Sequence, residues 1–244
     1  MTTLAMLAAP ALGQEVDLNA MSNLTNKYIQ SMQVGTPGTP SHRFVYVNAR
    51  ARLFVYKINE GVLEKDWEAV DLGSKAATMV VTDLNGDGTT KLVVATIRGR
   101  VLIYDFDTYN LEWENLQDGY TSIDYMAHAN LDGDPQQEIV IIADRLLYIY
   151  DGFNKNIQWV SDTEFGAKMF LIGNVDDDPQ LEIVLNSGRV VDTRFYNIEF
   201  EADGQFGDRI TLFDLNMDGY LDVFGEFADF SIRVYDVWAQ RELW

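Results

Sequence analysis

Cysteine is absent from this sequence, and histidine, proline and basic side chains are scarce. Without cysteine the chain has neither a disulfide framework nor a thiol nucleophile. Its 18 lysines and arginines stand against 38 acidic residues, which gives a formal net charge of −20. A charge of this sign argues against nucleic-acid binding, because that function requires a basic surface. No stretch reaches the roughly 18 apolar residues of a membrane-spanning helix, so no transmembrane segment is expected.

The N-terminal residues are apolar and small, and a polar segment follows them. The run Leu4–Gly13 consists mostly of alanine and leucine. This pattern is typical of the end of a secretory signal peptide, although the basic residues that usually precede it are missing. We therefore expect residues 1–13 to be the remnant of a signal peptide and residues 14–27 to be a lead-in. The expected location is secreted, periplasmic or cell-surface.

The most informative feature is an acidic nonapeptide, Asn130–Glu138, with Asp132-Gly133-Asp134 near its centre. Oxygen-bearing side chains stand at its positions 1, 3, 5 and 9, and the backbone carbonyl of position 7 can add another oxygen. In a tight turn this spacing points the oxygens at one centre, and Gly133 permits the bend. Ca²⁺ takes about 6–8 such oxygens. The nonapeptide therefore predicts a calcium site.

Two further nonapeptides, Asn174–Glu182 and Asp214–Asp222, keep all four side-chain positions. The predicted Ca²⁺ ligands of these three loops are Asn130, Asp132, Asp134, Gln136, Glu138, Asn174, Asp176, Asp178, Gln180, Glu182, Asp214, Asn216, Asp218, Tyr220 and Asp222. A fourth copy has Lys91 in ninth place, where its ammonium can replace an ion. We expect about three Ca²⁺ sites and a doubtful fourth set, made of Asp83, Asn85, Asp87 and Thr89.

Two other structures are possible for these loops. An EF-hand loop begins with the same residues, but it needs a glutamate at position 12 and flanking helices. Here position 12 is Val94, Ile141, Leu185 or Gly225, and strand-like residues follow each loop. A plain acidic hairpin turn is the simpler alternative, because Asp-Gly and Asn-Gly are turn dipeptides. Three copies with the ninth carboxylate in place favour calcium.

The loops belong to a repeat of about 45 residues. An aromatic residue closes each unit, at Trp67, Trp113, Trp159, Phe200 and Trp244. An aspartate precedes three of these aromatics by eight residues, at Asp105, Asp151 and Asp236. Within one unit, short β-rich runs at 123–129, 138–143, 146–150 and 156–160 alternate with turn residues. This pattern predicts four antiparallel strands in each repeat.

We therefore predict an all-β fold, a β-propeller of four-stranded antiparallel blades over residues 28–244. About five blades fit the chain, at residues 28–72, 73–118, 119–164, 165–204 and 205–244. The first has no acidic loop. The fourth is shorter, because after Arg189 its third and fourth strands are joined more tightly and the Tyr-Asp turn is missing. We expect the recurring aromatic residue to pack between blades. The sequence leaves open whether an N-terminal strand completes the last blade or the chain is a fragment of a larger propeller.

An acidic loop followed by an aliphatic strand resembles the FG-GAP/VCBS repeat, whose pattern is D-x-D-G-D-G-x-x-D and two aliphatic residues. The loops 130–138, 174–182 and 214–222 align with this pattern position by position. They depart from it by asparagine at two first positions and by Asp177, Met217, Pro135 and Pro179 in place of glycines. The resemblance implies an integrin-α-like propeller with bound calcium, an extracytoplasmic location and a role in adhesion or ligand binding.

A weaker resemblance concerns the last turn of each unit. Tyr104-Asp105 before Trp113, and Tyr150-Asp151 before Trp159, share their spacing with quinoprotein-like repeats of the outer-membrane assembly lipoprotein type. The glycine of that phrase and the lipidation cysteine are both absent. This resemblance implies a propeller that acts as an assembly scaffold.

The sequence offers few groups for catalysis. His42 and His128 are its two histidines, and it contains no G-x-S-x-G motif and no phosphate-binding loop. We assign no catalytic residue. The function that we expect is a secreted calcium-binding propeller that acts as a ligand-binding or adhesion module, with a protein or glycan ligand on one face. The alternatives are a polysaccharide lyase or hydrolase on a propeller scaffold, and an envelope-assembly scaffold protein.

Overall fold

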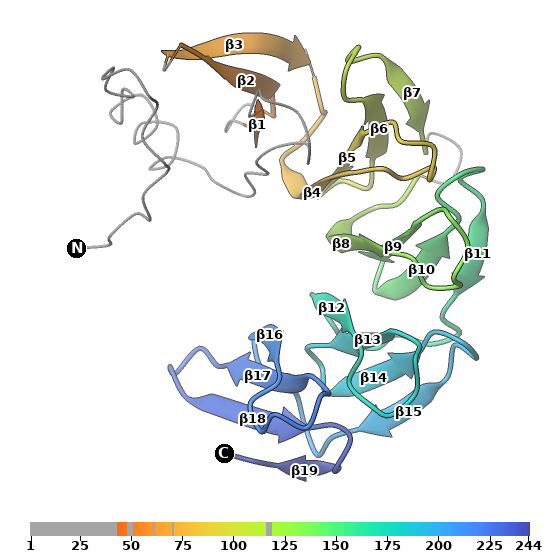
Figure 1. Cartoon of the computed structure of the whole chain (residues 1–244), viewed down its shortest axis with the longest axis vertical. Coiled ribbons are helices and arrows are strands. Elements are labelled where there is room, and N and C mark those ends of the chain that lie inside the picture. Colours follow the sequence, from red (N-terminus) through yellow and green to blue (C-terminus); the bar gives the residue numbers. More distant parts are fainter. Residues whose placement is uncertain (1–42, 48–50, 61, 70, 116–118) are drawn as a thin grey trace. The chain divides into compact units, whose positions relative to one another are not determined.

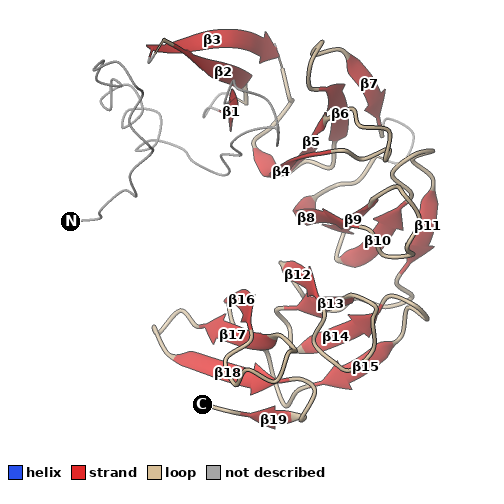
Figure 2. Cartoon of the chain, viewed as in Figure 1, coloured by secondary structure: helices blue, strands red, loops and turns tan. Residues whose placement is uncertain are grey.

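The computed structural model describes residues 43–47, 51–60, 62–69, 71–115 and 119–244. Within these ranges the regular elements are β-strands, and no α-helix occurs (Figure 2). A search of the same residues for a helix long and apolar enough to cross a membrane finds none. The expected signal-peptide remnant, the lead-in segment and His42 lie outside the described residues.

The chain divides into two compact units, and the first ends at Ala76. The described strands of this unit form an antiparallel sheet in the order β1-β2-β3. These strands are β1 (Arg43–Val47), β2 (Leu53–Asn59) and β3 (Val62–Ala69). Leu53 and Val55 of β2 are fully buried, because alternate residues of a strand point to the same face.

The second unit, Ala77–Trp244, contains four antiparallel sheets of four strands, each built from consecutive strands (Figure 1). The second sheet is β4 (Ala76–Thr82), β5 (Lys91–Thr96), β6 (Val101–Asp105) and β7 (Leu111–Glu114). The third is β8 (Ile123–Ala129), β9 (Glu138–Ala143), β10 (Leu146–Tyr150) and β11 (Ile157–Val160). The fourth is β12 (Phe170–Gly173), β13 (Glu182–Leu185), β14 (Arg189–Asp192) and β15 (Ile198–Glu201). The fifth is β16 (Arg209–Phe213), β17 (Asp222–Glu226), β18 (Ile232–Asp236) and β19 (Arg241–Glu242).

The predicted all-β fold of antiparallel sheets is confirmed, including the strand positions in the third sheet. Strands β8, β9 and β10 begin and end where the β-rich runs predict, and β11 begins one residue later, at Ile157. The second strand of a sheet carries the densest run of leucine, isoleucine and valine. Every residue of β5, β9 and β13 is buried, as expected for strands that are covered on both faces.

Apolar layers join consecutive sheets within the second unit. The first layer combines Val93 and Ile103 of the second sheet with Met126 and Ile141 of the third. Similar layers join the third sheet to the fourth and the fourth to the fifth. Trp113, Trp159 and Phe200 pack against these layers, as the sequence predicts. Trp244 differs, because 72% of its surface is exposed.

An aspartate turn joins the third and fourth strands of all four sheets, and one prediction about it was wrong. The fourth sheet does have the turn, at Asp192, whose Oδ1 accepts hydrogen bonds from the backbone N–H groups of Arg194 (2.5 Å) and Phe195 (3.4 Å). Asp151 accepts in the same way from Phe153 and Asn154, both at 2.8 Å. Asp192 also stands eight residues before Phe200. The preceding Val191, where the sequence pattern has tyrosine, concealed it.

Candidate cation-binding loops

Each acidic loop joins the first and second strands of its sheet, and its ninth residue opens the second strand. Glu138, Glu182 and Asp222 are 1%, 1% and 2% exposed. One carboxylate oxygen of each accepts a hydrogen bond from the backbone N–H of the second loop residue. The distances are 2.6 Å from Leu131, 2.9 Å from Val175 and 2.8 Å from Leu215. The ninth residue is therefore a buried acid whose side chain closes the loop.

The loop 130–138 brings its acidic groups to one place. Carboxylate oxygens of Asp132, Asp134 and Glu138 all lie within 4.8 Å of one another. The loop is held by hydrogen bonds from its own backbone: Asp134 N–H donates to Asp132 Oδ1 at 3.1 Å, and Gln136 N–H donates to Asp134 Oδ1 at 2.7 Å. Asn130 Oδ1 accepts from Gly133 N–H at 2.7 Å. These bonds fix the carboxylates in a hard-oxygen cluster of the kind that Ca²⁺ prefers.

The loop 174–182 has the same backbone frame and a different set of acids. Asp178 N–H donates to Asp176 Oδ1 at 2.9 Å, and Gln180 N–H donates to Asp178 Oδ1 at 2.8 Å. The close group here is Asp176, Glu182 and Glu199, with oxygens within 4.8 Å of one another. Glu199 lies on β15, outside the loop. The sequence pattern gave no reason to select it, because it lies 17 residues after Glu182 and belongs to no motif.

The loop 214–222 is more open than the other two. In the part of the chain that the structure describes, its carboxylates do not form a comparably close group. Asp214 Oδ2 accepts from Gly219 N–H at 3.1 Å, and Asp218 Oδ1 accepts from Tyr220 N–H at 3.0 Å. The amide of Asn216 turns toward Asp236 and donates to its Oδ2 at 3.2 Å. Asn216 Oδ1 accepts from Asp218 N–H at 2.9 Å, as the third residue does in the other two loops.

The loop 83–91 differs from the other three, because its ninth residue is Lys91 and not an acid. Lys91 is 4% exposed, and its Nζ donates to Asp105 Oδ2 at 3.1 Å and to Glu112 Oε1 at 2.8 Å. Burial lowers the pKa of Lys91, but the bonds to Glu112 and Asp105 raise it above its ordinary value. The ammonium therefore stays charged and neutralises two carboxylates of its own sheet. Asp83 and Asp87 accept hydrogen bonds from the loop backbone, as the acids of the other loops do.

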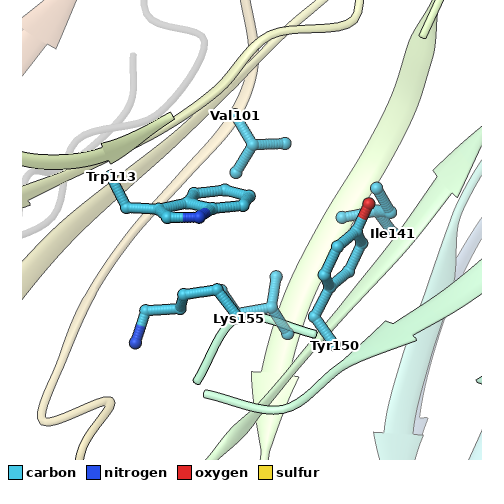
Figure 3. A pocket seen from close by; sticks show the side chains of 6 residues that line it. Val101, Trp113, Ile141, Tyr150 and Lys155 are labelled. Carbon is cyan, nitrogen blue, oxygen red and sulfur yellow. The ribbon is translucent and has the colours of Figure 1, made fainter. Parts of the chain in front are cut away.

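A second lysine reaches this loop from the third sheet. Lys155 follows the Asp151 turn with a positive φ of 63°, and its Nζ donates to Asn85 Oδ1 at 3.1 Å. Figure 3 shows its alkyl chain below Trp113 and beside Tyr150, at a small cavity of about 10 Å³. Burial lowers the pKa of Lys155. Two ammonium groups thus stand at the loop 83–91, and we assign it no metal ion.

The buried acids of the other loops carry an electrostatic cost in the absence of a counter-charge. Burial, followed by repulsion from Asp132 and Asp134, raises the pKa of Glu138 to about 7. Burial and neighbouring carboxylates raise the pKa of Glu182 to about 8 and that of Glu199 to about 7. The ionised forms are therefore destabilised at neutral pH unless a cation is bound.

Several side-chain oxygens in these loops and on β15 are without hydrogen-bond partners. Asn174 Oδ1, Glu199 Oε1 and Asp214 Oδ1 are buried and accept no hydrogen bond. Buried polar atoms are normally paired, and oxygens without a hydrogen-bond donor are available to coordinate a cation. The residues at the loops 130–138 and 174–182 therefore fit a divalent metal ion such as Ca²⁺.

The described histidine does not enter this arrangement. His128 lies on β8, and its Nδ1 is hydrogen-bonded to Gln137 Oε1. It contacts none of the carboxylates that form the clusters. This position agrees with a structural role.

Comparison with known proteins identifies the fold. The sequence matches no protein-family model and no curated protein. Among the solved structures that resemble this chain are those of three proteins. Sqt1 of Saccharomyces cerevisiae gives a TM-score of 0.63 at 16% identity, over 89% of this chain and 62% of Sqt1. BBS1N in complex with ARL6DN gives 0.61 at 13% identity, over 87% and 64%. BamB from Moraxella catarrhalis gives 0.50 at 16% identity, over 86% and 59%.

These neighbours are β-propellers, and this chain has the same fold. The predicted β-propeller is thereby confirmed. Identities of this size establish the fold alone. The chain spans less than two thirds of the length of each neighbour, so their activities and partners do not transfer to it directly.

Proposed function

We propose that this chain is a calcium-stabilised β-propeller that binds a protein partner outside the cytoplasm. The observation that carries the proposal is the set of buried acids: Glu138, Glu182 and Asp222 are almost fully buried beside other carboxylates. A divalent cation would neutralise them and fix the loops between the first two strands. The acidic composition and the apolar N-terminal residues agree with a compartment in which calcium is near millimolar.

The expected energy of this effect is modest for each site and useful in sum. Extracellular calcium modules have Kd values of roughly 10⁻⁴–10⁻³ M, and about 1 mM ion then adds roughly 0.4–1.4 kcal/mol per site. Three sites add about 1–4 kcal/mol, against a total of ~5–15 kcal/mol for a typical domain. Calcium therefore adds to the stability of a propeller that folds without it.

A protein partner is favoured by the surface of the fifth sheet and by one structural neighbour. Phe213, Phe230 and Trp244 expose 59%, 85% and 72% of their surfaces. Ile210, Phe224, Phe230 and Ile232 line a groove of about 270 Å³ on the same sheet. An exposed apolar groove of this kind is a candidate interaction surface. BBS1N, which has a similar fold, was crystallised in complex with ARL6DN.

The proposal is tested by thermal unfolding of the full chain with 2 mM Ca²⁺ (a proposed condition) and with a chelator. We expect calcium to raise the melting temperature by roughly 3–15 °C. Asp132→Asn should reduce this rise, whereas Asp162→Asn, at an exposed position outside the loops, should leave it unchanged. Equal melting temperatures with and without calcium would contradict the proposal.

The partner is sought with the same protein in two assays. The immobilised chain is incubated with secreted proteins of the source cells in calcium and in chelator, and a glycan array is probed in parallel. Saturable, calcium-dependent binding of a purified protein supports the proposal. Binding to glycans alone, or cleavage of a glycan, would replace the protein partner by a carbohydrate.

A further inference from the structure

The second and fourth sheets place three charged residues at the same positions. In the second sheet Lys91 opens β5 and pairs across the sheet with Asp105 at the end of β6. The register between β6 and β7 shifts at Tyr104, and Glu112 is the extra residue at this bulge. An ammonium from β5 therefore stands between two carboxylates, one from β6 and one from β7.

The fourth sheet repeats this geometry with the opposite charge at its centre. Glu182 opens β13 and pairs with Asp192 at the end of β14. The register between β14 and β15 shifts at Val191, and Glu199 is the extra residue at this bulge. Three carboxylates thus occupy the positions of one lysine and two carboxylates.

Glu199 differs from its counterparts in the other sheets in its burial, and one of its carboxylate oxygens has no hydrogen-bond partner. It is half-buried, whereas Glu112 and Gln158, at the same bulge position of the second and third sheets, are exposed. Its Oε1 is a buried atom without a hydrogen-bond partner, and Asn174 Oδ1 of the adjoining loop is in the same state. The oxygens of Glu199, Asp176 and Glu182 converge within 4.8 Å.

We propose that Glu199 is a ligand, supplied from outside the acidic loop, of the divalent cation bound at 174–182. The proposal rests on the proposed function, which places a cation in this loop. The cation takes the role that Lys91 Nζ has in the second sheet, so the second sheet carries its own positive charge and the fourth sheet obtains it from solution. One extra carboxylate makes this site tighter than the site at 130–138, where the bulge residue is Gln158.

The experiment is a calorimetric titration of the full chain with Ca²⁺, comparing Glu199→Gln with the matched variant Glu112→Gln. We expect Glu199→Gln to weaken the tightest site by about tenfold or more, because the charge of the ligands sets calcium affinity. Glu112→Gln should leave calcium binding unchanged, since its partner is Lys91. Gln158→Glu should strengthen the site at 130–138.

Two further variants separate this proposal from the proposed function. Glu182→Gln should remove one calcium equivalent if the loop binds calcium at all. Glu182→Lys places a lysine where the second sheet has Lys91. This variant should also bind one calcium equivalent less, and it should keep a cooperative unfolding transition in chelator. If Glu199→Gln binds calcium as the wild type does, while Glu182→Gln binds one calcium equivalent less, the role of Glu199 is overturned and the proposed function stands. A wild-type protein that takes up no calcium would overturn both proposals.

Discussion

Replacement of Glu182 by glutamine should stabilise the calcium-free protein at alkaline pH. Glu182 is 1% exposed, and its pKa is raised from 4.5 to about 8, first by burial. A raised pKa in the folded state means that folding favours the protonated acid. The corresponding stability is complete below pH 4.5 and is lost as the pH rises through about 8. At pH 8.5 the ionised carboxylate therefore weakens the fold.

The size of this effect follows from the shift. A shift of about 3.5 units is worth roughly 5 kcal/mol as an upper limit, at 1.4 kcal/mol per unit. Glutamine still accepts the hydrogen bond that Val175 N–H donates at 2.9 Å, but its amide N–H₂ must find partners, which costs about 1–2 kcal/mol. The net gain is therefore at most roughly 3–4 kcal/mol, or a rise in melting temperature of up to about 6–16 °C for a chain of this size.

The assay is thermal unfolding in chelator at pH 8.5, followed by the same measurement with calcium. Glu182→Gln should melt above the wild type in chelator and should gain less from calcium. Leu185→Ala, a core substitution in the same strand, is the control that lowers the melting temperature in both conditions. A variant that melts below the wild type in chelator would show that the Glu182 carboxylate stabilises the fold by itself, and the argument for a missing counter-charge would fail.

Three further predictions concern pH, the lysine of the second sheet and a buried amide. In chelator, the melting temperature should fall between pH 5 and pH 8, because the pKa values of Glu138 and Glu182 are raised to about 7 and about 8. Calcium should abolish this fall, and a melting temperature in chelator that does not change with pH would contradict the prediction. Lys91→Met should lower the free energy of unfolding by about 2–4 kcal/mol, because Asp105 and Glu112 lose the ammonium that neutralises them. A denaturant midpoint equal to that of the wild type would refute the role of this ion pair. In the wild type, calcium should leave hydrogen exchange in the second sheet unchanged. Asn115→Ala should cost about 2 kcal/mol, because this buried side chain accepts from Val101 N–H at 2.7 Å and donates to Gly99 O at 2.9 Å; a loss below about 0.5 kcal/mol in urea unfolding would contradict that account.

Much of the fold was accessible from the sequence because the repeat combines signals of different kinds. Acidic turns, apolar second strands and a late aromatic residue recur in phase, and strands β8, β9 and β10 were predicted to the residue. The aspartate turn of the fourth sheet was missed because Val191 stands where the other sheets have tyrosine. The backbone bonds to Asp192, which do not depend on the preceding side chain, define the turn.

The candidate site was predicted in its local part and missed in its long-range part. Spacing within a nonapeptide is visible in sequence, so Asp132, Asp134 and Glu138 were selected and do lie together. Glu199 comes to Glu182 through a β-bulge two strands away, and a bulge leaves no sequence signature. The pairing of Lys91 with Asp105 and Glu112 was hidden for the same reason.

The most direct test of the central claim is diffraction from crystals of this chain grown with calcium, and with terbium as an anomalous scatterer. The account predicts a peak in the loop 130–138, coordinated by Asp132, Asp134 and Glu138 at the roughly 2.3–2.6 Å that calcium requires, and a second peak between Asp176, Glu182 and Glu199. Loops that hold only water at saturating calcium, with these carboxylates unchanged, would contradict it.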